Sequence, residues 1–194
     1  GLLNPLIREL SSRASFEVYL IISGSHLLED FGKTVCEIDT SMVKSIRKIP
    51  LSVTDANKKV ELLVLFSDVI REGTTALANL NPQFLVLAGD RYETFAMAVT
   101  AYYLNIPIVH LFGGDLSQGG HLDDSVRHSI TKIAHLHFTT NVDSYTRVLH
   151  LGEEKWRVFN VGSTVMDNIL DCRYASADEL AKEFNFAGIA TAHH

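Results

Sequence analysis

Only two of the 194 residues are cysteines, Cys36 and Cys172. Because they lack the close spacing of a metal site, we interpret them as reduced thiols of a cytosolic protein. The longest apolar runs, such as residues 84–88, are far too short to span a bilayer, and no basic start precedes an apolar stretch. The sequence therefore predicts neither a membrane partner nor a signal peptide.

Long basic runs are also absent, and the net charge is −6. The nearest approach to a basic cluster is formed by Lys44, Arg47 and Lys48, and three cations beside a loop are typical of a solvated face. Binding to nucleic acid depends on clustered positive charge, so we expect no nucleic-acid partner. Internal repeats, low-complexity stretches and obvious linkers are missing as well.

What is present is the composition of a soluble globular protein, with 46% hydrophobic and 21% charged residues. The length suits one α/β domain or slightly more, and the apolar content is enough to bury a sizeable core. Segments with the pattern of a strand alternate with segments that have the period of an amphipathic helix. The expected strands are residues 16–22, 84–88, 108–112, 136–140 and 158–161. The expected helices are residues 2–10, 60–71, 94–104, 123–135 and 143–151, and a last helix that begins at a capping box of Ser176 and Glu179.

This alternation predicts an α/β fold with a Rossmann-like, doubly wound parallel sheet, on which the helix over residues 2–10 packs. We expect residues 84–88 to be buried on both faces and Gly152 to end the helix that precedes it. Both ends of the chain look unfinished, because no strand precedes the first helix and residues 188–190 could begin another strand. Parallel sheets of this kind bind ligands beyond the carboxyl ends of their strands, and three polar clusters follow strands here.

The first cluster is Gly89-Asp90-Arg91-Tyr92-Glu93, directly after the strand over residues 84–88. Glycine allows a tight turn, which places Asp90 at the carboxyl end of the strand. Asp90 is either a functional carboxylate or the N-cap of the next helix, since aspartate is favoured at that position. In the second case Arg91 and Glu93 would be solvated residues of the first turn.

The second cluster begins at His110 and continues through Gly113, Gly114 and Asp115 to Gly120. Its glycines allow the backbone to approach a ligand closely, and its N–H groups suit phosphate or sugar oxygens. The alternatives are a surface loop without a ligand and, for His110, a hydrogen-bonded histidine of the core.

The third cluster lies at the start of the helix over residues 123–135. Asp123 and Arg127 are four residues apart and share a face, as do Asp124 and His128. A surface helix with ion pairs is the alternative interpretation. His128 and His135 also share a face, but no carboxylate or cysteine completes a set of metal ligands, so we expect no metal. Together the three clusters supply carboxylates, a cation and glycines where an α/β sheet builds its site, which favours an enzyme over a binding module.

Residues 89–168 resemble the hydrolysing UDP-N-acetylglucosamine 2-epimerases, enzymes of sialic and related nonulosonic acid biosynthesis. The family's G-D-R-x-E stretch is matched by residues 89–93. Its H-x-x-G-G-E stretch is matched by residues 110–115, with Asp115 in place of glutamate. Residues 123–132 match D-D/E-x-x-R-H-x-I-T-K, residues 135–138 match H-x-H-F, and residues 151–153 and 159–167 match L-G-E and F-N-V-G-x-x-x-x-D.

The resemblance implies one half of a two-domain enzyme of the GT-B type, with the active site between two Rossmann-like domains. Residues 1–185 would form the N-terminal domain, whose first strand precedes residue 1. Residues 186–194 would begin the second domain or be a tag remnant. The resemblance also implies a UDP-sugar substrate, no cofactor and a homo-oligomer in the full-length protein. Because one wall of the site would be missing, we expect these 194 residues alone to show no turnover.

The implied reaction converts UDP-N-acetylglucosamine into N-acetylmannosamine and UDP by elimination followed by hydration. The resemblance assigns catalytic roles to three carboxylates, those of Asp90, Asp115 and Asp123. It assigns substrate binding to Arg91, His110, Gly113, Gly114, Asp124, Arg127 and His128.

One departure from the family concerns Phe112. Some relatives have glutamate there, and phenylalanine cannot transfer a proton. UDP-N,N'-diacetylbacillosamine is therefore an alternative substrate, and a non-hydrolysing epimerase or a GT-B glycosyltransferase is an alternative activity.

Overall fold

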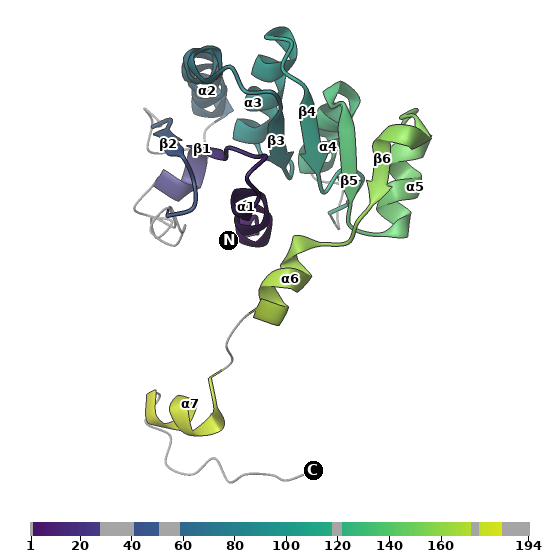
Figure 1. Cartoon of the computed structure of the whole chain (residues 1–194). Coiled ribbons are helices and arrows are strands. Elements are labelled where there is room, and N and C mark those ends of the chain that lie inside the picture. Colours follow the sequence, from purple (N-terminus) through teal and green to yellow (C-terminus); the bar gives the residue numbers. More distant parts are fainter. Residues whose placement is uncertain (1, 28–40, 51–58, 118–121, 172–174, 184–194) are drawn as a thin grey trace.

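The computed structural model describes residues 2–27, 41–50, 59–117, 122–171 and 175–183. The predictions for Cys36, Cys172 and Gly120, and those for residues 186–194, lie outside the described residues. Within the described part, two parallel sheets lie beside each other in the order β2, β1, β3, β4, β5, β6 (Figure 1). The predicted α/β fold with parallel strands is confirmed.

The larger sheet contains β3 (Leu85–Ala88), β4 (Ile108–Leu111), β5 (Leu136–Thr139) and β6 (Val158–Asn160), paired in that order. All three of its pairings are parallel. The smaller sheet pairs β1 (Tyr19–Ile22) with β2 (Ser45–Lys48), also in parallel. Strand β2 has no strand pattern in the sequence, because three of its four residues are polar or basic. Arg47 and Lys48 are exposed on this strand rather than beside a loop.

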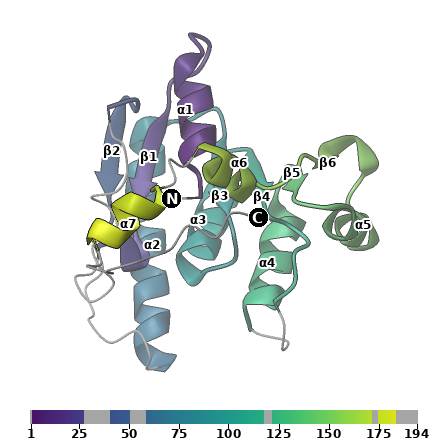
Figure 2. The same ribbon diagram turned by 90° about the horizontal axis from the view of Figure 1, so that it is seen from below.

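Helices cover the strands from both sides. They are α1 (Asn4–Ser12), α2 (Lys59–Leu80), α3 (Tyr92–Tyr103), α4 (Leu122–Ile133), α5 (Val142–His150), α6 (Thr164–Asp171) and α7 (Ala177–Glu183). Helices α3 and α4 pack against the larger sheet and α2 packs on α3, whereas α1 and α6 lie on the side of the strands opposite α2 (Figures 1 and 2). The principal contact of α1 is α6 rather than the sheet, and no residue of α1 is buried.

Helix α2 is longer than its sequence pattern indicates, because it continues through Gly73 to Leu80. A Cβ atom at Gly73 would lie 2.7 Å from the sulfur of Met97, so this glycine permits the close approach of α2 to α3. Asn81, whose φ is +44°, follows the last residue of the helix and precedes Pro82. Even α2, the longest of the described helices, lacks a stretch apolar enough to cross a membrane.

The core lies between the larger sheet and helices α2, α3 and α4, and Ile108, Ile130 and Leu77 are almost completely buried there. All four residues of β4 are buried, as expected for an internal strand. The prediction that residues 84–88 are buried on both faces is wrong, since only Leu87 of β3 is fully buried. The reason is that β3 pairs with β4 on one edge and with none of the described strands on the other.

The unpaired edges of β1 and β3 belong to strands that run in the same direction. The rings of Phe16 and Phe84, which precede the two strands, are 6.5 Å apart. After the strands, a Cβ atom at Gly24 would lie 2.4 Å from the carboxylate of Glu93. The two sheets are therefore neighbours at both ends without pairing. The strand that the resemblance places before residue 1 stays a prediction.

Two local predictions for helix ends are confirmed. Gly152 follows α5 with a φ of +90°, and its N–H donates to the carbonyl of Leu149. Ser176 and Glu179 form the capping box of α7, in which each side chain accepts a hydrogen bond from the backbone N–H of the other, at 3.2 and 2.8 Å.

Two leucines of α2 give a test of this packing. Leu65 is completely buried, whereas Leu63 is 70% exposed on the same helix. Leu65→Ala should lower the free energy of unfolding by about 2–5 kcal/mol, because it leaves a cavity. Leu63→Ala should change it by less than about 0.5 kcal/mol. Urea unfolding of both variants checks this, and equal losses would contradict the placement of α2.

Candidate active site at the carboxyl ends of the strands

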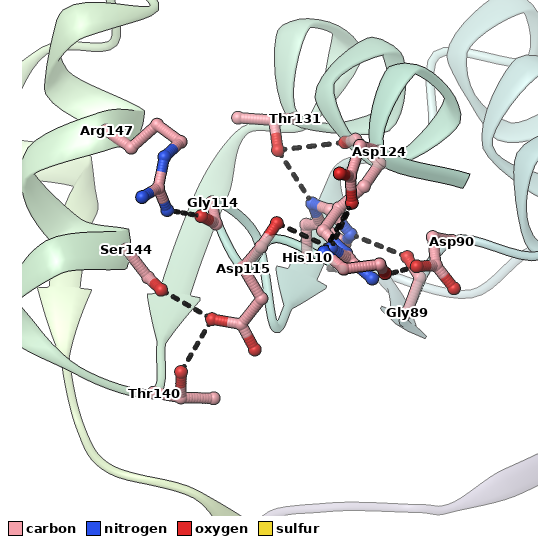
Figure 3. A network of polar contacts seen from close by, with 12 residues as sticks. Gly89, Asp90, His110, Gly114, Asp115, Asp124, Thr131, Thr140, Ser144 and Arg147 are labelled. Carbon is pink, nitrogen blue, oxygen red and sulfur yellow. Dashed lines mark hydrogen bonds and ion pairs between the residues drawn. The ribbon is translucent and has the colours of Figure 1, made fainter. Parts of the chain in front are cut away.

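The three polar clusters meet at one edge of the larger sheet, as the parallel strands require. Asp90 follows β3, Asp115 follows β4, and Thr140 follows β5. Figure 3 shows side chains from these three strand ends and from the first turns of α4 and α5 within a single network of polar contacts. The prediction that the clusters share the carboxyl edge of the sheet is confirmed.

Arg127 joins the clusters. This residue of α4 is buried, with 10% of its side chain exposed, and its guanidinium forms an ion pair with the carboxylate of Asp90. It also donates to the carboxylate of Asp124 at 3.1 Å and to the backbone carbonyl of Asp115 at 2.5 Å. Burial lowers the pKa of Arg127, but a guanidinium stays charged at neutral pH. One buried cation therefore contacts groups from all three clusters.

These contacts overturn two alternative interpretations of the sequence. Asp90 is not the N-cap of α3, because Arg91 occupies that position and Asp90 turns instead to Arg127. The third cluster is not a surface helix with ion pairs, because Arg127 is buried. Its partner on α4 is Asp124, one turn away at i,i+3, rather than Asp123.

The glycine loop after β4 begins with a strained residue. Phe112 has a φ of +65°, a conformation that is unfavourable for a bulky side chain. Its N–H donates to the carbonyl of Phe138 at 3.1 Å, and its carbonyl accepts from the N–H of Asp115 at 3.4 Å. Backbone bonds on both sides thus hold the turn, and strain of this kind is often found at functional sites.

Gly113 and Gly114 allow close packing of this loop against the protein itself. A Cβ atom at Gly114 would lie 2.3 Å from the carbonyl oxygen of Ser144, and one at Gly113 would lie 3.1 Å from the ring of His110. Arg147 of α5 also donates to the carbonyl of Gly114. The described part of the loop is therefore held against α5 and β4. A direct contact of these two glycines with substrate stays a prediction.

The Asp115 carboxylate accepts two hydrogen bonds from hydroxyl groups. Thr140 donates at 2.7 Å and Ser144 donates at 2.5 Å (Figure 3). Thr140 and Ser144 both lie outside the three polar clusters of the sequence. Thr140 follows a strand, as Asp90 and Asp115 do, so its position could have been predicted from the sequence. The role of Ser144 depends on how α5 packs.

His110 lies behind the site rather than in it. Its ring is completely buried, with Nε2 3.0 Å from the carbonyl oxygen of Gly89 and Nδ1 3.2 Å from the hydroxyl of Thr131. A carbonyl can only accept, so Nε2 carries the proton of the neutral ring. Burial lowers the pKa of His110 to about 4, which keeps the ring neutral at pH 7. The geometry supports the core interpretation of this histidine.

The remaining predicted residues lie at the rim of the network. Arg91 is mostly exposed and pairs with Glu93 at 2.7 Å. Asp123 is exposed in the first turn of α4 and has no hydrogen-bond partner among the described residues. His128 is half-buried, and burial lowers its pKa. Asp124, its predicted partner, accepts instead from Arg127 and from the backbone N–H of Ser117 at 2.8 Å.

The described residues contain no group of three histidine, cysteine or acidic side chains placed to hold a metal ion. The chemistry that this arrangement can supply is proton transfer by carboxylates and stabilisation of negative charge by a guanidinium.

Burial of neutral His110 makes the stability of the protein depend on pH. The pKa is about 4 in the folded state and 6.5 as the ordinary value, so between these values the unfolded state binds more protons. Stability should therefore fall as the pH decreases from 6.5 toward 4. His110→Gln should reduce the loss of unfolding free energy between pH 7 and pH 5 by roughly 2 kcal/mol. The reason is that His110 contributes about 1.4 kcal/mol for each of the roughly 1.5 pH units between 6.5 and 5.

Urea unfolding at the two pH values measures this effect. Some pH dependence should remain, since burial also lowers the pKa of His137. His150→Gln, at an exposed position, is the matched control. An undiminished pH dependence in His110→Gln would contradict a neutral His110.

The chain is similar to proteins named as UDP-sugar 2-epimerases. A protein from Campylobacter jejuni, the GDP/UDP-N,N'-diacetylbacillosamine 2-epimerase (hydrolyzing), is 36% identical over 93% of this chain and 46% of its own length. The UDP-N-acetylglucosamine 2-epimerase of Neisseria meningitidis serogroup B is 28% identical over 95% of this chain and 47% of its own length. The chain thus spans about half the length of the relatives it matches.

Solved structures show the same fold. The UDP-GlcNAc 2-epimerase from Neisseria meningitidis, solved bound to UDP-GlcNAc, has a TM-score of 0.74 at 20% identity, covering 87% of this chain and 45% of that one. The UDP-GlcNAc 2-epimerase from Methanocaldococcus jannaschii has a TM-score of 0.69 at 21% identity, covering 87% and 44%. The family described as UDP-N-acetylglucosamine 2-epimerase matches residues 8–193. The chain therefore belongs to the UDP-N-acetylglucosamine 2-epimerase family.

Proposed function

We propose that the full-length protein containing this chain is a hydrolysing UDP-sugar 2-epimerase that converts UDP-N-acetylglucosamine into N-acetylmannosamine and UDP. The observation that carries the proposal is the convergence of Asp90, Asp115 and Arg127 at the carboxyl ends of β3 and β4. Family membership and relatives named as hydrolysing 2-epimerases support it.

The proposed reaction has two steps. In the first, a carboxylate removes the proton at C2 while the bond between C1 and the diphosphate oxygen breaks, which gives a glycal and UDP. In the second, water adds at C1 and C2 takes a proton on the opposite face, which gives the free 2-epimer. Because the C2 proton is only weakly acidic, removing it needs both a positioned base and an assisted leaving group.

The carboxylates differ in what they can contribute. Asp90 is paired with Arg127, whereas Asp115 is held by neutral hydroxyls and Asp123 is exposed. We assign the proton transfers to these three carboxylates. We assign stabilisation of the developing negative charge to Arg127, and substrate contacts to Arg91, Asp124 and His128 around the same edge. The half-length of the chain leaves the second wall of the site to the rest of the protein.

The sugar has a second candidate. The relatives from Campylobacter jejuni, at 36% identity, and Legionella pneumophila, at 30% identity, are both named as hydrolysing epimerases of an N,N'-diacetylbacillosamine nucleotide. The family resemblance also implies glutamate in some members at the position of Phe112, in the loop that carries Asp115. UDP-N,N'-diacetylbacillosamine is therefore the alternative substrate.

Product analysis tests the reaction. The full-length protein, incubated with each of the two UDP-sugars separately in D₂O, should release UDP and a free 2-epimer that carries deuterium at C2 from UDP-N-acetylglucosamine. Turnover of UDP-N,N'-diacetylbacillosamine alone would identify the alternative substrate. The deuterium follows from reprotonation by solvent after the C2 proton is lost. NMR and chromatography of the products check this. A UDP-linked 2-epimer would indicate a non-hydrolysing epimerase instead, and retention of the C2 proton would exclude the glycal route.

Three substitutions test the assigned carboxylates. Asp90→Asn, Asp115→Asn and Asp123→Asn should each lower kcat by about 10²-fold or more, the scale of general acid–base catalysis. Asp143→Asn is the matched control, because Asp143 is also an exposed aspartate in the first turn of a helix, α5. Steady-state release of UDP measures the effect. A variant that keeps the kcat of the parent would remove that carboxylate from the mechanism.

A further inference from the structure

The Asp115 carboxylate is held through one oxygen only. The hydroxyls of Thr140 and Ser144 both donate to Oδ1, at 2.7 and 2.5 Å. The second oxygen, Oδ2, has no hydrogen-bond partner among the described residues, and Figure 3 shows it pointing away from both hydroxyls. One oxygen is thus anchored and the other is free for a ligand.

The two hydroxyls belong to residues that are themselves held by hydrogen bonds. Ser144 is 2% exposed, and its backbone N–H donates to the side chain of Asn141, the N-cap of α5, at 2.9 Å. Its carbonyl lies against Gly114, and Thr140 accepts a hydrogen bond from Asn141 at 3.0 Å. The anchor of the carboxylate is therefore the junction of β5 and α5, which is fixed by its own hydrogen bonds.

The hydroxyls hold Asp115 without neutralising it. Asp90 and Asp124 each form an ion pair with Arg127, which offsets their charge. The Asp115 side chain accepts hydrogen bonds from two neutral hydroxyls, which orient the carboxylate but do not offset its negative charge. Among the three, the carboxylate of Asp115 is the one that is both positioned and electrostatically uncompensated by its direct partners.

We infer that Thr140 and Ser144 are positioning residues that orient Oδ2 of Asp115 for proton transfer at the sugar. This inference rests on the proposed function. The side chain of aspartate is short, so the position of the free oxygen Oδ2 depends on how the carboxylate is turned about its anchored oxygen Oδ1. Small misplacements of a catalytic group are costly, and about 1 Å of displacement can lower the rate 10²-fold.

The test uses the full-length enzyme. Thr140→Val and Ser144→Ala should each lower kcat about 10-fold, and the double variant about 10²-fold, because the carboxylate is no longer held in the reactive orientation. KM should stay within about 2-fold in all of them, since Asp115 acts on the reacting bond rather than on the bulk of the substrate. Thr140→Ser keeps a hydroxyl and should restore most of kcat.

Thr139→Val is the matched control. Thr139 is the neighbouring threonine, but its hydroxyl donates to the carbonyl of Phe159 on β6 at 3.3 Å and does not reach Asp115. This variant should keep the kcat of the parent. Thermal unfolding of all variants, measured in parallel, separates loss of the fold from loss of orientation.

The possible outcomes distinguish failure of the positioning role from failure of the proposed function. An unchanged kcat in the double variant, with Asp115→Asn inactive, overturns the positioning role and leaves the proposed function intact. A parental kcat in Asp115→Asn removes Asp115 from the mechanism and overturns the positioning role, while the reaction itself stands. A joint fall in kcat and unfolding temperature that Thr140→Ser does not rescue assigns these hydroxyls a structural role only. No UDP release from either sugar by the parent overturns the proposed function itself.

Discussion

The arrangement of the site depends on the burial of one cation. A guanidinium in the interior loses the hydration that it has in water, and ion pairs and hydrogen bonds must compensate for that loss. Arg127 obtains them from the side chains of Asp90 and Asp124 and from the backbone of Asp115. These groups come from the segments after two strands and from a helix. The contacts of one side chain therefore hold three separate segments together. Removing the cation would leave the partly buried carboxylate of Asp90 without its ion-pair partner, and Asp124 would keep only the N–H of Ser117. The cost of leaving such a charge uncompensated can exceed the stabilisation that the ion pair itself provides.

Because of this constraint, the carboxylates of the site have different partners. The two that compensate Arg127 have part of their acceptor capacity occupied, and Asp124 also accepts the N–H of Ser117. Asp115 contacts Arg127 only through its backbone carbonyl, so its carboxylate is left to the neutral donors of the junction between β5 and α5. The same loop is strained at Phe112 and tightly packed at Gly114. The backbone is thus fixed where the reacting group would have to be placed with little freedom.

The histidines of the strands serve a different purpose. His110 and His137 are completely buried on adjacent strands, and burial keeps both neutral near pH 7. His110 joins the turn after β3 to α4 through the carbonyl of Gly89 and the hydroxyl of Thr131. It thereby supports the turn that carries Asp90 from behind. His110 belongs to a sequence motif that suggests ligand binding, but in the structure its ring makes hydrogen bonds within the core.

The sequence by itself determined the alternation of strands and helices, the parallel sheet and the edge at which the polar clusters meet. These follow from local periodicity and from a general rule of parallel sheets, so residues near one another in the chain suffice to predict them. Only the tertiary structure decided that Asp124 rather than Asp123 pairs with Arg127, that Asp90 is not a helix cap, and that Thr140 and Ser144 hold Asp115. Side-chain partners depend on helix rotation and on contacts between residues 25 to 37 positions apart, such as Asp115 with Thr140 and Asp90 with Arg127. Local sequence patterns carry no information on such distances, because the packing of whole elements sets them.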